Sequence, residues 1–319
     1  TGCEDAIVVN NNASAVFFFF FIFAKNKEVV VSRGELVEIG GSFRVPEVMN
    51  QSGAILKEVG TTNKTHLSDY ENSINENTSM LMKVHKSNYS IEGFTSEVDF
   101  EEIVKIANEN NIIDYFDMGS GHIIDLPYNL NKDEPSILDI MKYKPSLLSF
   151  SGDKLFGSVQ AGIIIGKKEL IAKIKKNQLL RMLRVDKITL SILEDTLNSY
   201  LKNELHDIPT LNMLFATLET LEQKANSLFE KIKDICKCEI IKTQTLIGGG
   251  TTPNKKIPSI ALCIKNETYK PNQLEKLFRK NNLIARIENE KLLLDFRTIQ
   301  ENEIEKIAVI IIKIFQRAN

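Results

Sequence analysis

The sequence predicts an α/β protein that is built on a mainly parallel β-sheet and carries a smaller α+β domain at its C-terminal end. In the first half, short apolar segments with strand character alternate with helical patterns, which is typical of a sheet covered by helices on both faces. Beyond about residue 190, two long helical patterns come first and a few strands follow. We therefore expect a large domain over residues 1–190 and a small one over 191–319.

The strands of the large domain are short and apolar, and we expect them at 6–9, 28–32, 54–59, 79–84, 112–116, 147–150 and 162–165. Residues 13–24 are apolar on every side and include an unbroken row from Phe17 to Phe21. Twelve residues are too few to cross a bilayer of roughly 30 Å, so this segment predicts a buried helix. Residues 100–110 predict an amphipathic helix, because Ile103, Ile106 and Ala107 share one face.

In the small domain, helical patterns cover 188–205, 211–236, 272–281 and 303–316. Strands are expected at 239–242, 259–265 and 292–296. The domain boundary is placed inside or at the start of the first of these helices.

The composition is that of an ordinary globular protein, with 319 residues of which 43% are hydrophobic and 26% charged. It excludes a fibrous protein and a small disulfide scaffold. The net charge of −2 gives no overall basic field, so a nucleic-acid partner would need a local patch. The chain begins with Thr1 and shows no signal peptide, and we expect further residues before it.

The four cysteines have no histidine at metal-binding spacing, so we expect no metal site. Cys236 and Cys238, separated by one residue, are only a weak metal or redox signal. Reduced thiols in a cytoplasmic protein are the favoured interpretation.

Polar or small residues follow four of the predicted strands. In open parallel sheets, ligands bind at the carboxyl ends of the strands, so these residues are expected to meet. The first group also opens a helix, whose backbone N–H groups form an anion site. The residues are Asn11, Asn12 and Ala13 after the first strand, then Asn88, Asp117 and Lys154 after three later ones.

This set matches what pyridoxal phosphate requires: a lysine for a Schiff base, a carboxylate for the ring nitrogen and an anion site for the phosphate. Asp117 and Lys154 suit two strand ends joined by a helical crossover. Ser149 and Ser151, just before the lysine, can donate to the phosphate. Each residue alone has an ordinary explanation as a turn, a cap or a solvated charge, so the prediction depends on their order.

Several longer stretches carry a resemblance to one family. They are TGCEDA at 1–6, VNNNAS at 9–14, VSRGELVEIGGSFR at 31–44, EVGTTN at 58–63, KVHKSNY at 83–89, DMGSG at 117–121, FSGDKLFG at 150–157 and LRVDK at 183–187. On these motifs the sequence resembles the bacterial L-seryl-tRNA(Sec) selenium transferases, or selenocysteine synthases. These are pyridoxal-phosphate enzymes of the aspartate aminotransferase fold (type I). The resemblance is strong over about residues 1–200 and thinner beyond, where DFRT at 295–298 is its clearest part.

The resemblance implies a role for each matching residue. Lys154 is the Schiff-base lysine, and Asp117 is the partner of the pyridinium nitrogen. Asn88 bonds the phenolic oxygen of the cofactor, and Asp153 is a candidate for proton handling at the leaving or entering group. Asn11, Asn12 and Ala13 face the phosphate. Arg297, a carboxylate clamp in relatives that act on free amino acids, is expected to serve structure here.

Arg181 and Arg184 match a pair that binds the phosphate-like selenium donor in the family. The residues alone point the same way, since 167–187 is rich in lysine and arginine. A spacing of three residues would place both guanidinium groups on one helix face, where they could clamp an oxyanion. The alternative interpretation is a solvated basic helix.

The resemblance implies conversion of seryl-tRNA(Sec) to selenocysteyl-tRNA(Sec), by β-elimination of the serine hydroxyl and addition of selenium from selenophosphate. It also implies a homo-oligomer, at least a dimer and a ring of dimers in the intact family. Family members carry a tRNA-binding region before the point where this chain begins. Two alternatives remain: a pyridoxal-phosphate lyase acting on a small amino-sugar-acid phosphate, and a catalytically silent tRNA-binding scaffold.

Overall fold

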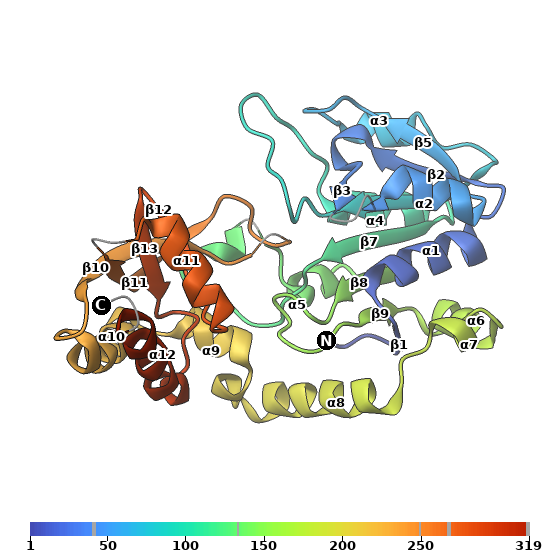
Figure 1. Ribbon diagram of the computed structural model, residues 1–319. Helices are drawn as coiled ribbons and strands as arrows, with labels where there is room; N and C mark the ends of the chain where they lie inside the picture. Colours follow the sequence, from blue (N-terminus) through green and yellow to red (C-terminus); the bar gives the residue numbers. More distant parts are fainter. Residues whose placement is uncertain (40–42, 133, 249, 267–268, 317–319) are drawn as a thin grey trace. The chain divides into compact units, whose positions relative to one another are not determined.

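The chain folds into two compact units in a computed structural model that describes residues 1–39, 43–132, 134–248, 250–266 and 269–316 (Figure 1). The first unit comprises Thr1–Leu211 together with Gly248–Asn254, and the second comprises Asn212–Ile247 and Lys255–Asn319. The boundary expected near residue 190 lies at the start of α8 (Lys187–Lys202), a helix that groups with the first unit.

A seven-stranded sheet forms the centre of the first unit, and the expectation of a mainly parallel sheet is confirmed. Five neighbouring strands are parallel, whereas β9 is antiparallel to both β8 and β1. The ends of the strands differ from those expected by at most three residues. Across the sheet the order is β1 (Asp5–Val9), β9 (Gly162–Gly166), β8 (Leu147–Ser151), β7 (Ile113–Gly119), β6 (Thr78–Val84), β2 (Glu28–Ser32) and β5 (Ile55–Val59).

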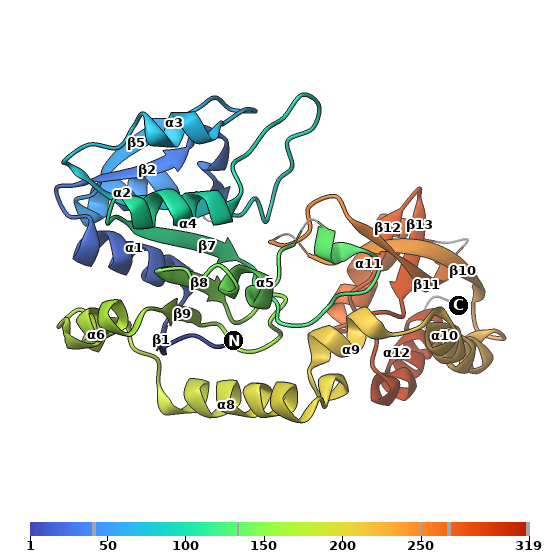
Figure 2. The ribbon, with the colours of Figure 1, turned by 180° about the vertical axis from the view of Figure 1, so that it is seen from behind.

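Helices cover both faces of this sheet (Figures 1 and 2). One face packs against α1 (Asn12–Phe23), α2 (Val45–Ser52) and α6 (Lys168–Lys176). The other packs against α3 (Leu67–Glu71), α4 (Phe100–Glu109) and α5 (Ile137–Met141). Of these, α1 and α4 match the expected helices to within one residue, α6 lies within the basic segment 167–187, and α2, α3 and α5 were not expected from the sequence.

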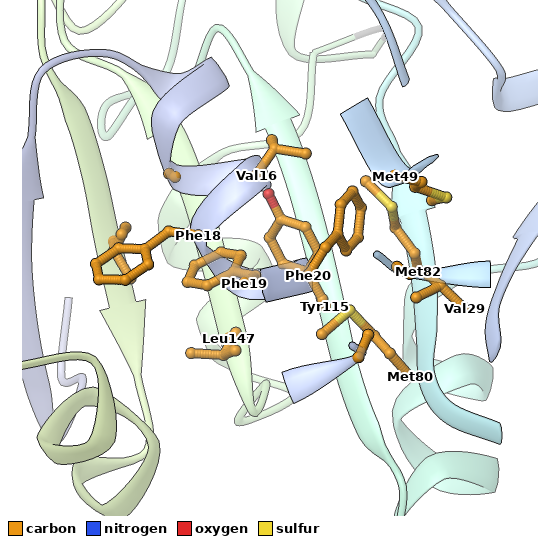
Figure 3. Packing of buried hydrophobic residues seen from close by; sticks show 14 of the residues in the cluster. Val16, Phe18, Phe19, Phe20, Val29, Met49, Met80, Met82, Tyr115 and Leu147 are labelled. Atoms are coloured by element: carbon orange, nitrogen blue, oxygen red, sulfur yellow. The ribbon is translucent and has the colours of Figure 1, made fainter. Parts of the chain in front are cut away.

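Helix α1 is buried through the middle of its phenylalanine row, while Phe17 and Phe21 at the ends of the row are half-buried. Phe18, Phe19 and Phe20 are wholly buried, and Phe19 meets Tyr115 of β7 edge to face with ring centroids 4.6 Å apart (Figure 3). Aromatic pairs in this arrangement contribute about 0.5–1.5 kcal/mol beyond the area they bury. The row therefore fixes α1 on the sheet and with it the position of the start of the helix.

Short elements complete the first unit. They are η1 (Arg33–Glu35), β3 (Glu38–Ile39), β4 (Phe43–Arg44), η2 (Leu130–Lys132), α7 (Leu180–Leu183) and η3 (Leu205–Asp207). None of the helices in the described part of the chain is long and apolar enough to cross a membrane.

The second unit contains a four-stranded antiparallel sheet in the order β10 (Lys237–Leu246), β11 (Lys256–Lys265), β13 (Lys291–Asp295) and β12 (Arg286–Glu288). The helices are α10 (Leu218–Ile232), α11 (Pro271–Lys280) and α12 (Ile304–Gln316), with η4 (Glu301–Glu303) before the last.

The single helix expected over 211–236 is two helices, because Thr217 caps the start of α10 and so interrupts the pattern after α9 (Pro209–Phe215). Arg297 is buried, and its Nη1 donates to the carbonyl oxygens of Met213, Leu214 and Ala216 at the end of α9. This arrangement fits the structural role expected for Arg297.

Candidate active site

The carboxyl ends of four strands and the start of α1 meet at one edge of the large sheet. Neighbouring strands place these residues in one row, because Asp117 lies beside Ser149, Ser151 beside Gly162, and Gly162 beside Val9. Asn11 and Asn12 follow Val9 directly and open α1. The edge therefore gathers residues that are up to about 150 positions apart in the chain.

Asp117 is a buried carboxylate at this edge, with 4% of its surface exposed. Its Oδ1 accepts hydrogen bonds from Asn12 Nδ2 at 2.7 Å and from the Gly119 N–H at 3.1 Å. Burial raises the pKa of Asp117, and these hydrogen bonds oppose the rise together with the positive charges of Lys154 and His85. A cationic partner would stabilise a buried carboxylate in this environment. This agrees with the expectation that Asp117 pairs with a protonated ring nitrogen.

The start of α1 has features that suit an anion. Asn11 is the N-cap residue, and its side-chain oxygen accepts from the Ser14 N–H at 2.8 Å. The first turn, which includes Ala13, contains no acidic side chain. Unpaired N–H groups at a helix start carry partial positive charge, so this end of α1 suits a phosphate.

Gly162 lies directly against this helix start. A Cβ atom at Gly162 would come within 2.3 Å of the Asn11 carbonyl oxygen and 2.9 Å of the Asn12 nitrogen. Only a glycine lets β9 approach the backbone this closely, so Gly162 allows the start of α1 to pack against β9.

We predict that Gly162→Ala lowers the free energy of unfolding by about 1–3 kcal/mol, the usual cost of overpacking, and weakens cofactor binding. Urea unfolding of the cofactor-free protein and a titration with pyridoxal phosphate measure the two effects. Gly248→Ala is the control, since a Cβ there meets no described atom within 4 Å. Equal effects of the two substitutions would contradict the prediction.

Two asparagine side chains in the site have an unused acceptor. Asn88 donates through Nδ2 to the Glu38 carbonyl oxygen at 2.9 Å, but its Oδ1 is buried without a hydrogen-bond partner. The Oδ1 of Asn12 is in the same situation. Buried polar atoms without partners are rare and costly, so both amides have capacity for a bound polar group.

Lys154 lies in the turn that follows β8, where its carbonyl oxygen accepts from the Gly157 N–H at 2.9 Å. Its side chain is half-buried, whereas the neighbouring Asp153 is exposed. Ser151 is buried beside Gly162. Ser149 is also buried, and its hydroxyl pairs with Tyr115 Oη at 2.7 Å, so it already has a protein partner.

Arg181 and Arg184 do not share a helix face, and that expectation is wrong. Helix α7 ends at Leu183, and Arg184 continues as extended chain. This extended segment forms a β-bridge with Val9, and the Asn10 N–H donates to the Leu183 carbonyl oxygen at 2.8 Å. The backbone thereby places Arg184 beside the end of β1. Both arginine side chains are exposed and make no ion pair with any residue in the described ranges.

Sequence reasoning missed Glu134, a buried carboxylate at the same edge. It accepts hydrogen bonds from His85, Ser120, Thr251 and Thr252. Glu134 lies in an irregular segment without hydrophobic periodicity, so no pattern in the sequence singled it out.

The cysteines take no part in this edge. All four are free thiols, and burial raises the pKa of Cys236 to about 12. Within the described ranges, no three histidine, cysteine or acidic side chains are grouped so that they could hold a metal ion.

Comparison with known proteins identifies the family. The family model for L-seryl-tRNA selenium transferase matches residues 1–300. The chain is 78% identical over 316 residues to the L-seryl-tRNA(Sec) selenium transferase of Aliarcobacter butzleri, covering 99% of this chain and 70% of that protein. The enzyme of the same name from Sulfurimonas denitrificans is 68% identical over 310 residues, covering 97% and 69%.

Among solved structures, D-glucosaminate-6-phosphate ammonia-lyase matches all of this chain and 83% of its own, with a TM-score of 0.70 and 19% identity. At that identity the likeness is one of fold, which is the aspartate aminotransferase-like type I fold of pyridoxal-phosphate enzymes. Family model and relatives agree over nearly the whole length, and the chain therefore belongs to the L-seryl-tRNA(Sec) selenium transferase family.

Proposed function

We propose that this chain converts seryl-tRNA(Sec) to selenocysteyl-tRNA(Sec), using pyridoxal phosphate as cofactor and selenophosphate as selenium donor. The observation that carries the proposal is the hydrogen bond from Asn12, at the start of α1, to the buried carboxylate of Asp117, with Lys154 after β8, the strand beside β7. When bound, pyridoxal phosphate supplies an electron sink for the bond broken at the serine Cα.

The residues present suit this cofactor. Lys154 would hold it covalently, and Asp117 would pair with its ring nitrogen. The start of α1, formed by Asn11, Asn12 and Ala13 and adjoined by Ser151, would bind its phosphate. Asn88 would donate to its phenolic oxygen through Nδ2, which carries a second hydrogen besides the one given to the Glu38 carbonyl oxygen. Ser149, tied to Tyr115, would support Asp117 from the neighbouring strand instead of contacting the phosphate.

The chain's own groups then divide the proton transfers. The amine of Lys154 takes the proton from the serine Cα, the role of a positioned general base. Asp153 is exposed next to it and would pass a proton to the β-hydroxyl, which departs as water. Asp117, buried and able to hold negative charge opposite a cation, keeps a proton at the ring nitrogen. Arg181 and Arg184 hold the selenium donor.

A chimera tests the function directly. This chain would replace the matching 316 residues of the Aliarcobacter butzleri enzyme, of which they make up 70%. With seryl-tRNA(Sec) and selenophosphate, we expect the chimera to form selenocysteyl-tRNA(Sec) at a rate comparable with that of the native relative. A folded chimera without product, beside an active relative, would overturn the proposal.

The two alternative functions make different predictions for the same protein. A lyase for an amino-sugar-acid phosphate would release ammonia from that compound without tRNA, and only the shared fold favours this. A silent scaffold would bind tRNA and form no borohydride-reducible adduct with pyridoxal phosphate. The presence of both Asp117 and Lys154 at one sheet edge argues against the scaffold.

We predict that alanine at Arg181 or Arg184 weakens saturation by selenophosphate by roughly ten- to a hundredfold, because a hydrogen bond to a charged group contributes about 1.5–3 kcal/mol. Affinity for seryl-tRNA is expected to change little. Separate titrations of donor and tRNA in the chimera measure both, and Lys176→Ala on α6 is a control for general loss of positive charge. A tRNA defect with normal donor saturation would place the arginines on the nucleic-acid surface.

We further propose that the protein acts in the cytoplasm as a homo-oligomer, at least a dimer and within a ring of dimers in the intact family. Helix α8 supports a partner surface, since several of its apolar side chains lie in solvent although Leu193 is buried: Ile188 is 73% and Leu201 85% exposed. Exposed apolar groups gathered on one element commonly mark protein–protein contact. Light scattering of the purified protein measures its mass in solution.

A further inference from the structure

Glu134 joins three separate segments of the first unit through one buried carboxylate. It is 1% exposed. Its Oε2 accepts from His85 Nε2 at 3.0 Å, after β6, and from Ser120 Oγ at 2.7 Å, after β7. Its Oε1 accepts from Thr251 Oγ1 at 3.1 Å and from the Thr252 N–H at 2.6 Å. Each carboxylate oxygen therefore accepts two hydrogen bonds. One oxygen faces His85 and Ser120, and the other faces Thr251 and Thr252.

The charge of Glu134 matches this environment. Burial alone would raise the pKa of Glu134, but the hydrogen bonds from His85, Ser120 and Thr252 and the charge of His85 outweigh it and hold the pKa below its usual range. The side chain is therefore an ionised carboxylate at neutral pH, and an ionised carboxylate can accept from both sides at once.

The segment at 250–254, here named the return loop, depends on these bonds. It lies between β10 and β11 in the sequence, yet it belongs to the first unit. Thr252 has φ +44°, an uncommon conformation for a β-branched residue, and Asn254 has φ +65°. Glu134 binds Thr252 at this bend, and Asn254 Nδ2 donates to Ser90 Oγ at 3.0 Å. The carboxylate thus holds a conformation that the loop would not favour alone.

The return loop meets Lys154. A Cβ atom at Gly250 would lie 3.1 Å from Lys154 Cε and 3.2 Å from Nζ. The backbone of the loop therefore lies against the reactive end of the lysine side chain and limits the positions that the amine can take.

We propose that Glu134 is a positioning residue that fixes the return loop against Lys154 and so orients the lysine amine for reaction with the cofactor. The inference rests on the proposed function of Lys154 and adds the residue that controls its placement. The reaction of the Lys154 amine with the aldehyde of pyridoxal phosphate can be measured without tRNA or selenium donor.

The test compares Glu134→Gln with Glu92→Gln, a control at an exposed glutamate. The glutamine keeps the volume but removes the charge and turns one accepting oxygen into a donor. Ser120 and His85 can accept from that donor, whereas the Thr252 N–H can only donate, so the Thr252 bond persists but now goes to a neutral amide. We expect amide exchange at Thr252 to rise by several-fold up to about tenfold, the difference between a hydrogen bond to a charged group and one to a neutral group. In parallel, formation of the borohydride-reducible adduct with pyridoxal phosphate in the cofactor-free protein is expected to slow several-fold.

Gly250→Ala is the second variant, because it leaves Glu134 unchanged and adds a methyl group where the loop meets the lysine. We expect it to change the rate of adduct formation as well, with Thr252 amide exchange close to normal. Faster exchange in Glu134→Gln with normal adduct formation in both variants would overturn the proposal. These rates are independent of selenium transfer, so failure of the proposed function in the chimera leaves this test interpretable.

Discussion

Replacing Lys154 by alanine is expected to abolish the borohydride-reducible adduct with pyridoxal phosphate. Selenium transfer should fall by at least about 10²–10⁴-fold, the usual contribution of a positioned general base. The half-buried side chain makes no hydrogen bond to any residue in the described ranges, so stability should stay within about 0.5 kcal/mol of the parent. Absorbance, reduction followed by peptide mapping, and urea unfolding measure the three effects.

Lys105→Ala, on the exposed side of α4, is the control for this substitution. It removes a lysine of the same unit without touching the site. If Lys154→Ala still formed a reducible adduct at another lysine at the parent rate, the assignment of Lys154 would be wrong.

Asp117→Asn is expected to lower the turnover of the enzyme without lowering its stability at pH 7. An amide cannot offer negative charge to the ring nitrogen, so we expect a loss of turnover of about 10–100-fold or more, given about 1.5–3 kcal/mol for a hydrogen bond to a charged group. Cofactor attachment through Lys154 should persist. Single-turnover kinetics and the reducible adduct measure these separately.

The same substitution changes how stability depends on pH. Burial raises the pKa of Asp117 in the folded protein, so the folded state binds more protons than the unfolded state above pH 3.8. The stabilisation is present below that pH and is lost as the pH rises through the raised pKa. In the parent, the free energy of unfolding therefore declines as the pH rises through this range. We expect this decline to be absent from cofactor-free Asp117→Asn, which should be at least as stable as the parent at pH 7.

Urea unfolding across the acid range, with Glu92→Gln as control, measures this dependence. The side-chain oxygen of the new asparagine can still accept from Asn12 and Gly119, so the loss of a bond does not obscure the result. An unchanged pH slope in Asp117→Asn would show that the carboxylate does not titrate as its burial implies.

The sheet and its principal residues followed from the sequence because they depend on local patterns. Apolar segments of strand length marked the sheet, and polar residues directly after them marked the edge where Asp117 and Lys154 lie. The small domain was recognised in outline, although Thr217 divides one expected helix into two. These features require no knowledge of which distant segments pack together.

What could not be predicted depends on contacts between distant segments. Glu134 binds Thr252, 118 positions later in the chain, and nothing local to either residue indicates the other. Arg184 leaves the helical pattern because its backbone pairs with Val9. Ser149 could be placed near the site from its strand, but its pairing with Tyr115 depends on the register of β7 and β8.

The return loop has a consequence for the timing of synthesis. Lys154 leaves the ribosome well before Thr252, which completes its surroundings through Glu134. The 98 residues from 155 to 252 take roughly 5–20 s to add at about 5–20 residues per second. A nascent chain that ends before the return loop can form the large sheet. Its Lys154 side chain, however, lacks the contact with that loop. Productive loading of the cofactor is thus a late event in the synthesis of the chain, after all of β10, the first strand of the second unit, has emerged.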